Sequence, residues 1–178
     1  MAFTASGAMY ETLNAMRLTI AKSATFQQLT GILDRTEAMT RVIYPRQMDV
    51  KQTKAEFKHP RPRAIVALDD GIELSDGGVG CYQTIIPIFV RFEMVVPKTW
   101  NDTPIEGDIE LEEHWFQSTW WAIAHEMTAT IRETNGTYIA CDTPFLVKER
   151  PDFYSPEKDA IDDGYYAVGL VWMGTGAI

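Results

Sequence analysis

Cysteine and histidine are both scarce in this chain of 178 residues, which has two cysteines and three histidines. The two cysteines, Cys81 and Cys141, lie far apart in the sequence and have no second pair. A disulfide framework or a cysteine-rich zinc site is therefore not expected. We expect both to be reduced thiols that pack as small apolar groups.

Long hydrophobic runs and an excess of basic residues are also missing. No segment approaches the roughly 20 consecutive apolar residues that a membrane span requires, and the N-terminal segment lacks the basic and apolar regions of a secretory signal. Acidic residues outnumber basic ones, 25 to 16, for a formal net charge of −9. Because such a surface repels phosphates, we expect no specific nucleic-acid binding and no membrane partner, and a protein made and used in a cytoplasm.

Sequence motifs for catalysis are absent as well. His125 and Glu126 have the form of the first two residues of a zinc-protease motif, but Ala129 stands where the second histidine is required. The glycine-rich segment 77–80 has no following lysine and does not fit a phosphate-binding loop. Neither cysteine lies in a signature for a nucleophile. The sequence therefore predicts a protein that is not an enzyme and has no cofactor.

A metal-dependent hydrolase remains as a less favoured alternative. Glu110 and His114 stand one helical turn apart and are able to share a metal ion with Glu113 or His125. However, His125 follows His114 by eleven residues, which is about 16 Å along a helix and too far for one ion. A binding module that acts as a monomer is a further alternative.

The N-terminal region has the pattern of two helices. Apolar residues recur every three or four positions, as in a helix that buries one stripe: Met9, Leu13, Met16 and Ile20. A second, short helix is expected to begin at Ser23 or at Thr25, since either side chain is able to cap it. Gly31 interrupts this helix.

Strand patterns dominate the middle of the chain. The longest strand is predicted at 82–97, where apolar residues alternate onto one face: Ile86, Ile88, Val90, Phe92 and Met94. The other face receives Phe89, Arg91 and Glu93, which indicates a sheet with one well-buried side. Pro87 cannot donate a backbone hydrogen bond, so we expect a sheet edge or a bulge there. Shorter strands are predicted at 41–46, 63–68, 72–74, 138–148 and 164–173.

A long amphipathic helix is predicted at 108–135. Asp108 is a suitable N-cap, and Asn135 with Gly136 is a typical stop. Its apolar stripe is expected to contain Ile109, Phe116, Trp120, Ile123, Met127 and Ile131. Trp121 falls about 100° away from Trp120, on a polar face with His125. We therefore predict that Trp121, His125 and the interrupted strand at Pro87 contribute to contacts between subunits.

Together these patterns predict one α+β domain over residues 1–178. N-terminal helices occupy residues 7–40, and a sheet with the long helix occupies residues 41–178. The sheet is expected to be mixed but mostly antiparallel, with the long amphipathic helix packed on one face.

This order of elements, with the phrase SATFQQLTG near the N-terminus and the aromatic strand YYAVGLVWMG near the C-terminus, resembles the tail terminator and tail-completion (neck) proteins of long-tailed bacteriophages. The likeness covers nearly the whole chain. It implies a structural protein without catalytic residues, cofactor or metal, whose copies form a ring at the joint between head and tail, usually a hexamer. The ring terminates or completes the tail tube and lets DNA pass.

The resemblance also implies partners and a location. The expected partners are further copies of the chain, the tail tube protein, and a head connector or stopper protein, in a virion assembled in the host cytoplasm. A head-side connector or stopper ring is the alternative within this class. We expect the acidic residues Asp69, Asp70, Glu73 and Asp76 to face the lumen, where negative charge keeps DNA from sticking. The segments 46–62 and 149–163 are long for a minimal member of the family.

Overall fold

The computed structural model describes residues 8–45, 60–68, 73–76, 82–133, 140–141, 145–146 and 165–177. In these residues a mixed sheet packs against a helical layer, which confirms the predicted α+β fold. The helices are α1 (Ala8–Lys22), α2 (Ala24–Thr30), α3 (Arg35–Ala38), the 3-10 helix η1 (Met39–Arg41) and α4 (Ile109–Glu133). Among them, none is both long enough and apolar enough to span a membrane.

Strands from both ends of the chain build the sheet. Its order is β1-β2-β4-β9-β7, with bounds Val42–Ile43, Arg63–Leu68, Tyr82–Val95, Tyr165–Ala177 and Ala140–Cys141. In addition, β3 (Glu73–Asp76) pairs with β4, and β8 (Phe145–Leu146) pairs with β9. Only the pair β1 and β2 is parallel among these described pairs, so the sheet is mostly antiparallel as predicted. A separate small ladder joins β5 (Thr99–Trp100) to β6 (Thr103–Pro104).

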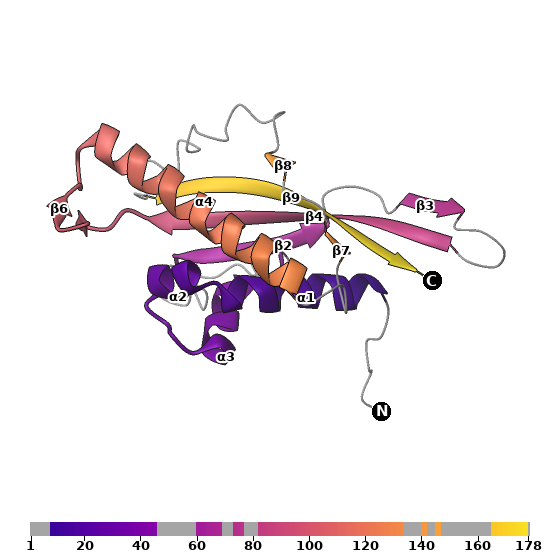
Figure 1. Ribbon diagram of the computed structural model, residues 1–178. Helices are drawn as coiled ribbons and strands as arrows, with labels where there is room; N and C mark the ends of the chain where they lie inside the picture. Colours follow the sequence, from indigo (N-terminus) through magenta and orange to yellow (C-terminus); the bar gives the residue numbers. More distant parts are fainter. Residues whose placement is uncertain are drawn as a thin grey trace.

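The helices lie on one face of the long β4 and β9 pair. Figure 1 shows α4 crossing this pair diagonally, with α1 and α2 beside it and α3 next to those two helices. The far ends of β4 and β9, together with β3, extend beyond the helices (Figure 1). The N-terminal helices and the long helix thus form a single layer, because each buries one apolar stripe against the same sheet.

Local capping sets the limits of α2. Ser23, rather than Thr25, is the N-cap: its hydroxyl oxygen accepts a hydrogen bond from the backbone N–H of Phe26 at 3.0 Å. Gly31 ends the helix in the left-handed region, with φ of 69°. A residue with a side chain is disfavoured in that conformation, so the glycine forms a suitable C-cap.

The core confirms the alternation predicted for β4 from Ile88 to Met94, while the side chain of Ile86 lies outside the described residues. Ile88, Val90, Phe92 and Met94 are fully buried on the face that meets the helices. Facing them are apolar residues from α1, α2 and α4: Met16, Ile20, Phe26, Phe116, Trp120, Ile123, Met127 and Ile131. The prediction for Ile109 is wrong, since this side chain is 79 % exposed. Ile109 is the first residue of α4, and no side chain of the described residues covers it there.

The expected sheet edge at Pro87 is also wrong. β4 is an interior strand, and Pro87 is a buried residue that pairs with Met173 of β9. On the opposite side of β4, β2 pairs as far as Ile88 and β3 resumes at Ile85. Residues 69–72, which connect β2 to β3 opposite this point of β4, lie outside the described residues, so the alternative of a bulge stays a prediction.

The second face of the sheet is buried in part, although the pattern predicted only one buried side. Ile65, Tyr165 and Val171 on that face are less than one-tenth exposed. Close packing there depends on Gly169: a Cβ atom at this position would lie 2.5 Å from the ring of Phe89. The absence of a side chain at Gly169 thus leaves room for the ring of Phe89 to pack against the neighbouring strand.

Candidate functional site

The N-terminus of α4 is held by three hydrogen bonds. Asp108 is the predicted N-cap: one of its carboxylate oxygens accepts from the backbone N–H of Leu111 at 3.2 Å. Glu112 reaches back to accept from the N–H of Gly107 at 2.6 Å, and its second oxygen accepts from the Tyr166 hydroxyl at 3.1 Å. These contacts join the first turn of the helix to strand β9, so α4 presents its outer face in a fixed orientation.

Tyr166 remains a hydrogen-bond donor at all ordinary pH values. Burial raises the pKa of its hydroxyl to about 12, and the hydrogen bond to Glu112 and the negative charges of Glu112 and Glu113 act in the same direction. The link between β9 and α4 therefore persists across the physiological range.

The side of α4 that faces away from the sheet carries a regular row of exposed residues. We call it the outer stripe, and it consists of Glu110, His114, Gln117, Trp121 and His125. The spacing of four, three, four and four positions keeps all five within about one-quarter of the helix circumference. The stripe is therefore a continuous surface along most of the helix.

Trp121 is the main apolar feature of the outer stripe. Its side chain is 61 % exposed, whereas the adjacent Trp120 is only 5 % exposed in the core. The two rings meet edge to face, with centroids 5.6 Å apart and planes at 83°. This geometry is favourable for aromatic pairs, so the buried ring orients the exposed one. The predicted division between an inward Trp120 and an outward Trp121 is confirmed.

The two histidines of the outer stripe are also exposed, and they do not converge. His114 lies edge-on to the ring of Trp100, with centroids 5.2 Å apart, while His125 lies eleven residues further along the helix. Within the described ranges, no group of three His, Cys, Asp or Glu residues is arranged to hold a metal ion. Glu110, His114 and His125 thus share one face without forming a common centre.

The residues predicted to face a lumen are less well defined. Asp69 and Asp70 lie outside the described residues. Glu73 and Asp76 begin and end β3, which pairs with the projecting part of β4. Their place relative to a ring axis stays a prediction.

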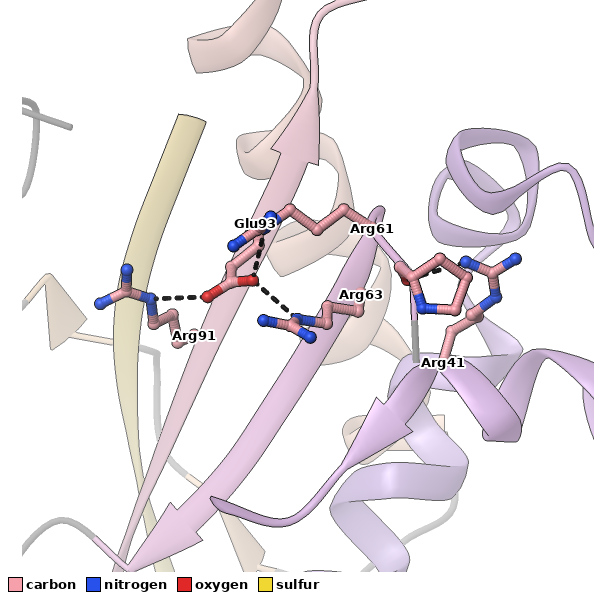
Figure 2. Close-up of polar contacts among 6 residues, drawn as sticks. Arg41, Arg61, Arg63, Arg91 and Glu93 are labelled. Atoms are coloured by element: carbon pink, nitrogen blue, oxygen red, sulfur yellow. Dashed lines mark hydrogen bonds and ion pairs between the residues drawn. The ribbon is translucent and has the colours of Figure 1, made fainter. Parts of the chain in front are cut away.

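A buried ion cluster on the second face of the sheet was missed by the sequence reasoning. Figure 2 shows Arg61, Arg63 and Arg91 converging on the carboxylate of Glu93. The Nε atoms of Arg63 and Arg61 lie 2.7 and 3.0 Å from one oxygen of Glu93, and the Nε of Arg91 lies 3.4 Å from the other. Arg63 and Glu93 are each only 2 % exposed.

Strand register explains this convergence. Arg63 and Glu93 are direct partners across β2 and β4, and Arg91 lies two positions along the same strand and hence on the same face. Arg61 also places its guanidinium over the ring of Tyr165, 3.7 Å from the centroid. The sequence did contain a signal, because charged residues occupy alternating positions of an apolar strand. Since the pattern indicated only one buried face, we assigned these residues to the solvent-exposed face.

A second unpredicted contact joins the N-terminal helices to α4. Glu126 accepts hydrogen bonds from the hydroxyls of Ser23 and Thr25, both at 2.6 Å, and from the backbone N–H of Thr25 at 3.1 Å. Burial by itself would raise the pKa of the Glu126 carboxyl. The hydrogen bonds from Ser23, Thr25 and the backbone of Ala24 together outweigh this effect, so the pKa lies below its ordinary value of 4.5. Glu126, which stands at the glutamate position of the zinc-protease motif, therefore joins α4 to the start of α2.

The lowered pKa predicts an acid-sensitive contribution of Glu126 to stability. A carboxyl whose pKa is lower in the folded state stabilises the fold fully above its unfolded value and loses this effect as pH falls through the folded value. We expect the Glu126→Gln variant to be less stable than the parent by about 1–3 kcal/mol at pH 7, and this difference to shrink below about pH 4.5. Urea unfolding of both proteins from pH 7 to pH 3 measures it. A difference that is constant over this range would contradict the assignment.

Comparisons with known proteins found no relative: the chain matches no family model, no curated protein and no solved structure. The outer stripe of α4, with the order of elements along the chain, therefore carries the functional inference.

Proposed function

We propose that the protein is a structural component of a long-tailed bacteriophage virion, whose copies assemble into a ring that terminates or completes the tail tube. The observation that carries this proposal is Trp121, an aromatic side chain 61 % exposed on an outer stripe that runs along a long, well-anchored helix. A large exposed aromatic residue is costly in water and is frequent at the centre of protein interfaces. The α+β fold agrees with what the family resemblance implies.

The charge of the chain supports a ring through which DNA passes without being bound. A formal net charge of −9 disfavours the phosphate contacts that retain DNA on a protein surface. A ring made of such chains allows the duplex to slide through without specific binding. The ring form, the copy number of six and the virion location are parts of this proposal.

The mass of the assembly in solution is the direct test. We expect the purified protein, or the protein in a tail preparation, to sediment as a ring of several copies, and the Trp121→Ala variant to sediment as smaller species. Glu37→Gln serves as a control, because Glu37 is exposed on α3, away from the outer stripe. A monomer in solution that is also absent from tails would contradict the proposal.

Binding to two purified partners separates the proposed role from its closest alternative. A terminator is expected to bind the end of the tail tube, whereas a head-side ring is expected to bind the connector or stopper protein. Binding to the connector alone would replace the terminator assignment with the head-side one.

A further inference from the structure

We infer that the segment 46–59 of each copy binds the outer stripe of α4 in the next copy of the ring. The inference rests on the proposed ring, and it names the two different surfaces through which neighbouring copies meet. This segment, which we call the basic arm, lies outside the described residues. Its composition, its length and the positions of its two ends favour the contact.

The exposed side of α4 carries negative and aromatic groups and no positive ones. Residues 109–131 of the helix include four glutamates and neither lysine nor arginine. Glu110 is exposed at the start of the outer stripe, and Glu106 and Asp108 are exposed immediately before it. Trp121 is the apolar centre of the same surface. A partner that fits the outer stripe therefore combines basic side chains with apolar ones.

The basic arm has this composition. It contains four basic residues and two acidic ones, in a chain whose formal net charge is −9. Large apolar residues alternate with the basic ones along it. The basic residues are Arg46, Lys51, Lys54 and Lys58, and the large apolar residues are Met48, Val50 and Phe57.

The two ends of the basic arm lie across the helical layer from α4. Before the arm, the described chain ends at Pro45, just after the border strand β1. After the arm, it resumes at Pro60, whose carbonyl accepts a hydrogen bond from Nη1 of Arg41 at 2.8 Å. Helix α1 contacts β1 and β2, and both α1 and α2 contact α4 (Figure 1). These helices separate the ends of the arm from the outer stripe of the same copy, whereas the stripe of a neighbouring copy is reached without crossing them.

The basic arm is long enough to reach a neighbouring copy. It has fourteen residues. Since an extended chain spans about 3.4 Å per residue, a segment of this length held at both ends extends about 20 Å away from them. A helix with its side chains is only about 10–12 Å across. The arm is therefore able to cover the outer stripe of a copy that lies beside β1.

This contact agrees with a ring that has two different sides. It joins an arm on one copy to a helix on the next, so each copy donates an arm to one neighbour and receives an arm from the other. Such head-to-tail contacts close into a ring without placing two-fold axes between the copies. A ring between head and tail requires this polarity, because it meets a different partner on each side.

Cysteine cross-linking tests the contact while Trp121 stays in place. The parent protein carries Cys81→Ser and Cys141→Ser, and the test variant adds Lys54→Cys in the basic arm and Gln117→Cys on the outer stripe. We expect a short bismaleimide to link this variant into a ladder of covalent pairs, trimers and larger species, because each copy carries both halves of the contact. Denaturing gel electrophoresis resolves the ladder.

The two single-cysteine variants are the matched controls. Each carries one half of the contact, so neither is expected to link alone, whereas copies assembled from a mixture of the two are expected to give covalent pairs. Linking of Gln117→Cys alone to the same extent as the mixture would show that two stripes face each other. A double variant that reacts within one chain would show that the arm covers its own copy. Either result would overturn the inference.

Charge variants give a second readout by sedimentation. Lys54→Glu is expected to weaken association about 3- to 5-fold in Kd, since attraction to the acidic end of the outer stripe becomes repulsion. Glu110→Lys in the same chain is expected to recover part of this loss. Arg35→Glu makes the same change of charge at an exposed residue of α3, and it is expected to leave association unchanged. Equal losses in Lys54→Glu and Arg35→Glu would overturn the assignment of the arm.

The outcomes separate this inference from the proposed function. If the double-cysteine variant does not link while the parent still assembles, the copies meet through other surfaces, so the inference fails and the ring proposal remains. If the ladder forms but the protein binds neither the tail tube nor the connector, the arm contact holds and the proposed virion role fails.

Discussion

Replacing Glu93 with glutamine is expected to lower the free energy of unfolding by about 3–5 kcal/mol. Glutamine keeps the size of the side chain and removes its charge, so the loss reports the ionic interaction. Arg63 lies 2.7 Å from the carboxylate and is only 2 % exposed. A guanidinium at such a site requires the opposite charge, because it has little access to water. Urea unfolding at neutral pH measures the effect.

Exposed acids provide the comparison for Glu93. Glu110→Gln changes a residue of the outer stripe that is exposed, and it is expected to alter the free energy of unfolding by no more than about 0.5 kcal/mol. The effect at Glu93 should also persist at high salt, since ions screen buried pairs much less than exposed ones. A loss below about 1 kcal/mol for Glu93→Gln would show that the cluster contributes little to the fold.

Truncation of Trp120 and of Trp121 is expected to affect two different properties. Trp120→Ala removes a large side chain from the core beside Phe116 and Ile123, which costs about 3–5 kcal/mol and is enough to unfold a domain of ordinary stability. Trp121→Ala removes mainly the edge-to-face contact, worth about 0.5–1.5 kcal/mol, and weakens association. Thermal melts beside sedimentation of both variants distinguish the two effects.

Trp120→Phe is the matched variant for this comparison. Within the described residues, the Nε1 atom of Trp120 is buried without a hydrogen-bond partner. Phenylalanine keeps an aromatic ring and removes this unsatisfied donor, so its cost should be well below that of alanine. If Trp121→Ala melts as early as Trp120→Ala while any oligomer persists, the outer stripe is not an interface and Trp121 acts in the fold.

The long helix and the longest strand were predicted correctly because their signals are local. The period of apolar residues in α4 and the alternation in β4 each define a buried face from the chain itself. The outward position of Trp121 follows from its angle on the helix. Asp108 was predicted as the N-cap for a similar reason, since a cap depends on the few residues that follow it.

Errors arose where the outcome depends on a distant segment. Ile109 fits the apolar stripe, but no described part of the chain covers its side chain. Pro87 reads as a sheet edge, yet it pairs with Met173 of β9 within an interior strand. Glu93 reads as a solvent-facing residue until strand pairing places Arg63 opposite it.

The sequence by itself determined the fold class, the stripe that α4 buries and the side on which Trp121 is exposed, because periodicity and capping act over a few residues. Only the tertiary structure decided the binding of Glu126 to the start of α2, a contact between residues about one hundred positions apart, and the convergence of three arginines on Glu93. Such contacts depend on strand order and helix packing. Neither strand order nor helix packing produces a periodic pattern in the sequence.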